Sequence, residues 1–455
     1  MRPSSSTADG LVGLLFGSEA VNAAVSDIAW LQAMLDVEAA LAGAGADAGL
    51  VPHGAAEEIA LVCRDGAFDV ASIGRRAVGA GNPAAPLVTD LIAALSPAAR
   101  PFVHLGATSQ DIIDTSLSLV AQRALDAMLI DLDSVAARCA LLAETHRETM
   151  MTARTLLQQA VPTTFGLKVT TWLVGVDECR ATLRRVRFER LAAQLGGAAG
   201  TLASLHDAGA EVLRGLAKRL GLVEPLVPWH TDRTRVAELA SALGMAIGVL
   251  GKMARDITLL AQAEVAEVAE GEGPEHGTSS TLPQKQNPVR AVLILAAAER
   301  APGLVGTAFH AMVQEHERAT GAWHAEWETQ RQLLRLAGGA SHHAARLLET
   351  LEVDAARMEQ NLASTGGLVM AESLAGCLSS KIDPPAAKAL VRRCSEESAA
   401  RHVPFAEVVA LDPEVRRHLS DAEIASAFDP LQYLGSTQVL IRRAQDAHRS
   451  GDVTA

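Results

Sequence analysis

The stretch His276-Gly-Thr-Ser-Ser-Thr-Leu-Pro-Gln-Lys-Gln-Asn-Pro-Val-Arg290 decides how the rest of this chain is interpreted. Glycine or proline occupies positions 271, 273, 274, 277, 283 and 288, so we predict a loop rather than a regular helix. The segments on either side, 233–270 and 289–300, are apolar and helix-forming. A loop between two long rigid elements is a common place for chemistry, because such a loop can close over a ligand.

Four polar side chains in this loop have chemistry suited to an anionic substrate: the hydroxyls of Ser279 and Ser280, the ammonium of Lys285 and the amide of Asn287. A lysine and an asparagine two residues apart can hold one carboxylate together, and a deprotonated serine can act as a base. The same composition is also typical of a Ser/Gly/Pro surface linker. The residue types alone leave both interpretations open.

A second informative stretch runs from Val103 to Thr115, Val-His-Leu-Gly-Ala-Thr-Ser-Gln-Asp-Ile-Ile-Asp-Thr. Gly106 predicts a turn, and the hydroxyls of Thr108 and Ser109 can cap the helix that follows. A helix N-terminus that carries two hydroxyls is suited to binding a carboxylate. An ordinary helix cap is the alternative.

The string Ser279-Ser-x-Leu-Pro-x-Lys-x-Asn-Pro288 resembles the signature of the fumarase/aspartase superfamily, which usually reads Gly-Ser-Ser-x-Met-Pro-x-Lys-x-Asn-Pro. Thr278 stands in place of the usual glycine, and Leu282 in place of methionine. Residues 103–115 resemble the first conserved block of that superfamily. There a Thr-Ser pair grips a substrate carboxylate, and the preceding histidine, His104 here, lines the pocket.

Residues 153–168, Ala-Arg-Thr-Leu-Leu-Gln-Gln-Ala-Val-Pro-Thr-Thr-Phe-Gly-Leu-Lys, resemble the second block, with one departure. Most relatives carry a histidine near its start that serves as acid or substrate ligand, whereas this chain has Leu156 and Gln159. The side chains of Gln158 and Gln159 can donate hydrogen bonds but cannot supply a proton at neutral pH.

The resemblance implies an all-α fold: a three-domain subunit with a long central helix bundle that assembles into a homotetramer. Each active site would take its blocks from three subunits. We expect an N-terminal helical domain at 1–105, the bundle at 106–350 and a C-terminal helical domain at 351–455.

The shared chemistry of the superfamily is addition or elimination next to a carboxylate, with no metal or organic cofactor. The resemblance makes Ser279 the base that removes the proton α to the carboxylate. Lys285, Asn287, Thr108 and Ser109 would stabilise the resulting aci-carboxylate, a developing dianion that needs preorganised donors. Catalytic roles would also fall to His104 and Gln159. Substrate contacts would fall to Gln158, His316 and Arg318.

Further strings resemble the bacterial 3-carboxy-cis,cis-muconate cycloisomerase branch: Gly81-Asn-Pro83, Pro228-Trp-His-Thr231, Glu315-His-Glu-Arg318 and Trp323-His-Ala-Glu-Trp327. That branch forms a lactone from a tricarboxylate, and Arg318 or Arg233 could bind the third carboxylate. His104, His230 and His316 are candidate acids.

An elimination lyase that releases fumarate stays open, including a nitrosuccinate lyase that expels nitrite or a C–N lyase. Nitrite and a lactone carboxylate are both good leaving groups, so the missing histidine does not separate these reactions. A serine hydrolase is disfavoured because Ser279 is not in a Gly-x-Ser-x-Gly elbow. A non-catalytic role is disfavoured because Ser279, Lys285 and Asn287 are all present.

Composition agrees with packed helices, because 49% of the 455 residues are hydrophobic and only 3% are aromatic. A net charge of −13 without a basic block argues against binding nucleic acid or an anionic membrane. Five scattered cysteines and the absence of an uncharged apolar run of about 18 residues predict a cytoplasmic protein with reduced thiols. A metal is not expected, because His316 and His324 are eight residues apart around a glycine.

Helical periodicity predicts a helix at 27–46, capped by Asp27, and long apolar helices further along the chain. The long helices are expected at 116–150, 170–195, 233–270, 289–316 and 328–351. One chain cannot bury an apolar face on each of them, so other subunits should complete the bundle.

Overall fold

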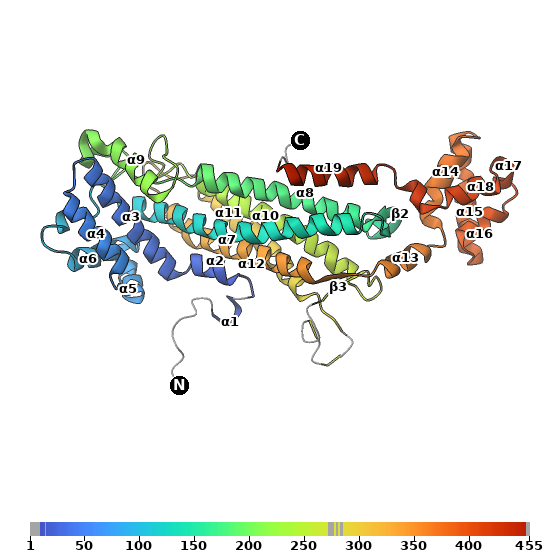
Figure 1. Cartoon of the computed structure of the whole chain (residues 1–455), viewed down its shortest axis with the longest axis horizontal. Helices are drawn as coiled ribbons and strands as arrows, with labels where there is room; N and C mark the ends of the chain where they lie inside the picture. Colours follow the sequence, from blue (N-terminus) through green and yellow to red (C-terminus); the bar gives the residue numbers. More distant parts are fainter. Residues whose placement is uncertain (1–9, 14, 272–276, 279–280, 283–284, 452–455) are drawn as a thin grey trace. The chain divides into compact units, whose positions relative to one another are not determined.

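The computed structural model describes residues 10–13, 15–271, 277–278, 281–282 and 285–451 (Figure 1). The α-helices are α1 (Gly10–Gly13), α2 (Glu19–Ala24), α3 (Asp27–Asp47), α4 (His53–Asp65), α5 (Val70–Ala80), α6 (Ala84–Ala94), α7 (Ser109–Thr145), α8 (Phe165–Arg185), α9 (Gly209–Leu220), α10 (Thr234–Leu260), α11 (Val289–His310), α12 (Ala322–Thr350), α13 (Ala355–Ala363), α14 (Ala371–Ser379), α15 (Pro384–Arg401), α16 (Phe405–Leu411), α17 (Val415–His418), α18 (Asp421–Ala427) and α19 (Thr437–Ser450). The strands are β1 (Met150–Thr155), β2 (Gln158–Thr164), β3 (Val268–Glu270) and β4 (Leu351–Val353). The predicted all-α class is therefore confirmed.

The chain divides into two compact units. The first unit consists of Met1–Asp133, Cys179–Lys252 and Leu293–Ala345, and the second of Ser134–Glu178, Met253–Val292 and Arg346–Ala455. Every boundary between them falls inside one of the long helices α7, α8, α10, α11 and α12. The division into domains at 1–105, 106–350 and 351–455 stays a prediction.

In the first unit, α3 packs against α4 and α9. The predicted helix at 27–46 is confirmed, but its cap is wrong: the Ser26 hydroxyl, not Asp27, accepts the backbone N–H of Ala29. α10 and α11 approach closely through glycines. A Cβ added at Gly244 would lie 2.6 Å from Val305, so the absence of a side chain permits this packing.

In the second unit, side chains tie the long helices and the C-terminal helix together. The indole Nε1 of Trp172 on α8 donates to Asp256 on α10 at 2.6 Å. On α19, the amide of Gln445 donates to the carbonyl of Ala140 on α7 at 2.7 Å. The last helix therefore packs along the bundle segments of its own unit.

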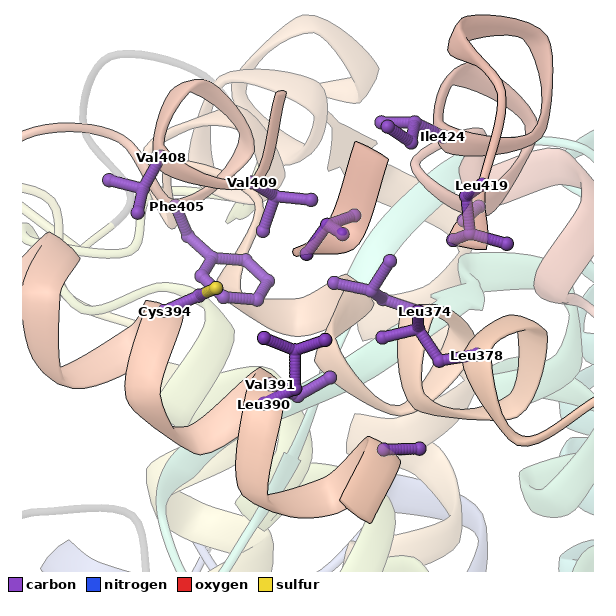
Figure 2. Close-up of a cluster of buried hydrophobic side chains, with 13 residues drawn as sticks. Leu374, Leu378, Leu390, Val391, Cys394, Phe405, Val408, Val409, Leu419 and Ile424 are labelled. Atoms are coloured by element: carbon purple, nitrogen blue, oxygen red, sulfur yellow. The ribbon is translucent and has the colours of Figure 1, made fainter. Parts of the chain in front are cut away.

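The region from α14 to α18, also in the second unit, has a hydrophobic core of its own (Figure 2). Leu374, Leu378, Phe405 and Val409 are fully buried there. Burying a side chain of this kind stabilises the fold by about 1.5–3 kcal/mol relative to leaving it exposed. Short helices too brief to stand alone are therefore held by one shared core.

Several predicted helix ends are wrong. α7 begins seven residues earlier than the predicted 116, at Ser109, and ends at Thr145. The chain then forms an antiparallel hairpin of β1 and β2 that the sequence analysis did not predict. α10 ends at Leu260 rather than 270, because Val268–Glu270 pairs with Leu351–Val353 as a small sheet. Strand pairing with a distant segment is invisible to local helical periodicity.

Two helices, α10 and α11, are long and apolar enough to span a membrane by length and composition. Core helices of soluble proteins pass the same test. The apolar stretch of α10 is 61% buried within the chain, whereas that of α11 is 22% buried. α11 thus presents a large apolar surface that the described part of the chain does not cover.

Candidate active site

A buried carboxylate organises the start of α7. Asp111 is fully buried, and its Oδ2 accepts the backbone N–H groups of Thr108 and Gly197, each at 2.9 Å. Its Oδ1 accepts the N–H of Gly196 at 2.9 Å and lies 2.7 Å from Nε2 of His230. The Asp111 carboxylate therefore joins the loop that contains Gly196 and Gly197, called here the glycine loop, to the N-terminus of α7 through strong hydrogen bonds.

Arg318 contacts both segments that Asp111 joins, the start of α7 and the loop after Gly196. Its Nη1 donates to Oγ1 of Thr108 at 2.8 Å, and its Nη2 donates to the carbonyl oxygens of Ala198 at 3.0 Å and Gly197 at 3.4 Å. The structure thus brings together two predicted site residues that are 210 positions apart. A guanidinium carries five N–H groups, so these three contacts leave donors for a ligand. A cation beside a helix N-terminus is suited to binding an anion.

His104 is paired with a buried glutamate. Its Nδ1 lies 2.7 Å from Oε1 of Glu38, and its backbone N–H donates to Oε2 of the same side chain at 3.1 Å. The backbone of His104 has a left-handed φ of 58°, which is uncommon outside glycine. Burial lowers the pKa of His104, but the hydrogen bond and charge of Glu38, with the charge of Asp111, outweigh burial and raise it.

Ser109 and His316 are also in the first unit. Ser109 is the first residue of α7 and is half-buried, whereas His316 is exposed with a φ of 47°. Neither side chain forms a hydrogen bond with the part of the chain that the structure describes. Their substrate contacts stay predictions.

Arg233 does not point to a free third carboxylate site, so that expectation is wrong. Its guanidinium is 1% exposed and contacts both Asp114, at 2.8 Å, and Glu326, at 2.6 Å. Burial raises the pKa of Glu326 to about 7, more than the pairing with Arg233 lowers it. His230 is likewise unsuited to act as an exposed acid, because it is buried against Asp111.

In the second unit, Gln158 and Gln159 are exposed at the start of β2. They pair with Thr155 and Arg154 across the hairpin, leaving Leu156 and Leu157 as a two-residue turn. Both leucines have positive φ, 50° and 66°, and Leu156 is 97% exposed. The hairpin is anchored by Arg154, whose guanidinium makes two hydrogen bonds to the fully buried Glu267.

The signature loop is also in the second unit. The backbone N–H and the side-chain amide of Asn287 both donate to the carbonyl of Gly277, at 2.8 and 2.7 Å. Gly277 has a φ of 68°, and a Cβ there would lie 2.3 Å from the carbonyl oxygen of Asn287. Lys285 is exposed. Ser279 and Ser280, including the predicted base, lie outside the described residues.

Among the residues that the structure describes, no cluster of three or more His, Cys, Asp or Glu side chains could hold a metal ion. The five cysteines are free, and burial raises the pKa of Cys63 to about 12. The Cys63 thiol is therefore a poor nucleophile and ligand at neutral pH.

The sequence analysis missed two supporting residues, Glu38 and Asp111. Asp111 lies inside the quoted stretch 103–115, and its spacing of three after Thr108 is a capping signal. Glu38 had only a weak signal, a single carboxylate on the buried face of the helix at 27–46. Its partner is 66 residues away, which no local pattern reveals.

Long apolar helices, a candidate anion site at a helix N-terminus and the Ser-Ser-x-Leu-Pro-x-Lys-x-Asn-Pro loop together are typical of a helical lyase. Residues 15–303 match the protein family described as "Lyase", and residues 367–444 match "Adenylosuccinate lyase C-terminus". The chain belongs to the fumarase/aspartase superfamily, which confirms the resemblance found in the sequence.

Three relatives are similar over nearly their whole length. A 3-carboxy-cis,cis-muconate cycloisomerase of Bradyrhizobium diazoefficiens is 44% identical, covering 96% of this chain and 98% of the relative. A nitrosuccinate lyase of Streptomyces davaonensis is 43% identical, with 96% and 94% covered. The crystal structure of 3-carboxy-cis,cis-muconate lactonizing enzyme from Pseudomonas putida has a TM-score of 0.91 at 41% identity, with 97% and 99% covered.

Proposed function

We propose that this chain catalyses the cycloisomerisation of 3-carboxy-cis,cis-muconate to a carboxymuconolactone. The observation that carries the proposal is the full-length similarity to cycloisomerases of that name, in sequence and in structure. The anion site at the start of α7 agrees with a substrate that carries several carboxylates.

In this reaction a carboxylate oxygen of the substrate adds to the diene, and a proton is delivered to the carbon α to another carboxylate. In the reverse direction Ser279 removes that proton and the lactone carboxylate leaves. Lys285 with Asn287 would bind one carboxylate, and Thr108 with Ser109 and Arg318 another. Gln158 and Gln159 would donate hydrogen bonds only, which is sufficient because a carboxylate leaving group needs no proton.

Elimination of nitrite from nitrosuccinate is the second candidate, because the nitrosuccinate lyase relative is nearly as similar as the cycloisomerases. Nitrite is also a weakly basic leaving group. The two reactions therefore make the same demands on Ser279 and the anion site, and differ in the shape and charge of the substrate.

Direct assay separates the two candidates. Incubation of the wild-type protein with 3-carboxy-cis,cis-muconate should abolish the ultraviolet absorbance of the diene. With the Ser279→Ala variant the absorbance should persist. Release of nitrite and fumarate from nitrosuccinate, with the diene unchanged, would instead establish the elimination lyase.

The proposal includes a soluble, cytoplasmic homotetramer with active sites shared between subunits. Its support is apolar surface left uncovered in the first unit, where Met245 on α10 and Phe309 on α11 are 52% and 51% exposed. These residues line one groove, together with Gly244, Gly248, Ala298, Ala301, Pro302, Val305 and Gly306. A helix from another subunit would fill such a groove.

Light scattering should give a mass about four times the 47.6 kDa of one chain. Met245→Asp should shift the protein to smaller species, whereas Val78→Asp, at an exposed position on α5, should not. Co-expression of Ser279→Ala with Thr108→Val should restore activity in mixed tetramers. An active wild-type monomer would contradict the assembly.

A further inference from the structure

The proposed substrate carries three carboxylates, and the described site residues include only two cations already assigned to substrate, Lys285 and Arg318. Arg233 is not available as a third, because its charge is taken by Asp114 and Glu326. A further side chain must therefore bind the third carboxylate, and its assignment rests on the proposed function.

The ring of His104 is oriented by Glu38, with one ring nitrogen paired and the other open. Both oxygens of Glu38 bind residue 104, one the ring Nδ1 and the other the backbone N–H. The Glu38 side chain is 1% exposed, so it is shielded from water and held in place by its neighbours. The His104 side chain is 21% exposed. The outer ring nitrogen, Nε2, has no hydrogen-bond partner within the described ranges. A buried anion on the inner nitrogen orients the ring and favours its protonated form.

We propose that His104, oriented by Glu38, binds the third carboxylate of the substrate through Nε2–H. His104 is then a substrate-binding residue, and Glu38 is a positioning residue that acts through it. No covalent bond changes at either side chain. With His104, the site would bind a tricarboxylate. Without it, Lys285 would bind one carboxylate and Thr108 with Arg318 a second, so a dicarboxylate would fill the site.

Two charged groups on different elements act on the ring: Glu38 on α3 and Asp111 on α7. Both favour the imidazolium, and together they raise the pKa of His104 against the effect of burial. Because the pKa is raised, the charged form persists to higher pH than in an exposed histidine. Affinity for a tricarboxylate should therefore be high below that pKa and fall as pH rises through it.

Isothermal titration calorimetry on the whole protein tests this, with trans-aconitate as the tricarboxylate and fumarate as the dicarboxylate. Raising the pH through the His104 transition should weaken trans-aconitate binding roughly tenfold or more, the usual worth of one charge-assisted contact. Fumarate binding should change little. His104→Asn should remove the pH dependence, and Glu38→Gln should move it to lower pH.

His402→Asn is a matched control, because His402 is an exposed histidine that also has a left-handed φ, 53°, which asparagine tolerates. It should leave binding and its pH dependence unchanged. If Glu38→Gln fails to fold, His104→Asn and His104→Gln still decide the matter. An unchanged pH dependence in either, or no binding of trans-aconitate to the wild type, would overturn the inference.

Turnover separates this inference from the proposed function. If the wild type does not consume carboxymuconate but binds trans-aconitate with the dependence on His104 described above, only the proposed reaction fails. If carboxymuconate is consumed and His104→Asn leaves KM and its pH profile unchanged, only the role of His104 fails.

Discussion

The candidate anion site at the start of α7 and the described residues of the signature loop, 277–278, 281–282 and 285–287, belong to the same proposed chemistry but are built differently. In the first, the buried Asp111 fixes Thr108 and the glycine loop, and these in turn hold Arg318. In the second, Lys285 is exposed, and Gly277 and Thr278 at one end of the loop pair with Gln286 and Asn287 at the other.

This difference in burial suits the α7 site to binding a carboxylate and the loop that carries Ser279 to proton transfer. A carboxylate site works best when its donors are dry and fixed before the substrate arrives, because no reorganisation is then needed. A group that must reach a carbon-bound proton can instead gain its surroundings when the substrate or another subunit covers it. We therefore expect changes in the α7 site to alter mainly affinity, and loss of the Ser279 hydroxyl in the loop to alter mainly turnover.

The largest effect should come from Ser279→Ala in the loop. Removing the base should lower kcat by roughly 10²–10⁴ while KM changes little, because the serine acts on the proton rather than on binding. Steady-state kinetics of the diene assay measure this, with Ser280→Ala as the control. Near wild-type turnover in Ser279→Ala and loss in Ser280→Ala would show that the neighbouring serine is the base.

The next largest effect should come from Arg154→Met, which leaves the fully buried Glu267 without its cation. Breaking a buried pair from one side costs about 3–5 kcal/mol, so the hairpin that presents Gln158 and Gln159 should loosen. Hydrogen exchange at 150–164 and thermal unfolding report it. Arg346→Met, which breaks an exposed pair with Glu349 in the same unit, should change both by very little.

Asp111→Asn tests the preorganised side of the comparison. An amide cannot accept all the N–H groups that the carboxylate accepts. The packing of Thr108 and the glycine loop, which hold Arg318, should therefore lose about 1–3 kcal/mol of stability. KM should rise more than kcat falls. Asp126→Asn, near the exposed middle of α7, is the matched control and should leave both unchanged. A fall in kcat alone would assign Asp111 to the chemistry instead.

The smallest effect per pH unit concerns Glu326, whose pKa is raised by burial from 4.5 to about 7. The folded protein therefore holds a proton that the unfolded chain releases, and its stability should fall as pH rises between these two values. Each pH unit in that window costs about 1.4 kcal/mol at most. Glu326→Gln should flatten the pH dependence of thermal unfolding between about pH 5 and pH 7. An identical slope in the variant would refute this origin.

Particular residues show how far local patterns reach. Thr108, Arg318 and the signature loop were recognised from short strings, and the structure brings the first two into contact. Arg233 was misassigned, because an arginine next to a quoted motif looks the same whether it faces a ligand or a buried carboxylate. The hairpin at 150–164 was missed because its strands follow directly after a long helical period.

The sequence by itself determined the superfamily, the all-α class and most of the residue types of the candidate site, because helical periodicity and short loop motifs are local. Only the tertiary structure decided which charges are free to meet a substrate. Glu38 and His104 are 66 positions apart, and Asp114 and Arg233 are 119 apart. In the first pair, packing holds one ring nitrogen of His104 against Glu38 and leaves the other without a hydrogen-bond partner in the described ranges. In the second, packing closes Arg233 into an ion cluster with Asp114 and Glu326. A charge takes its role from the partners and the solvent that packing leaves around it, and packing joins segments that no local pattern connects.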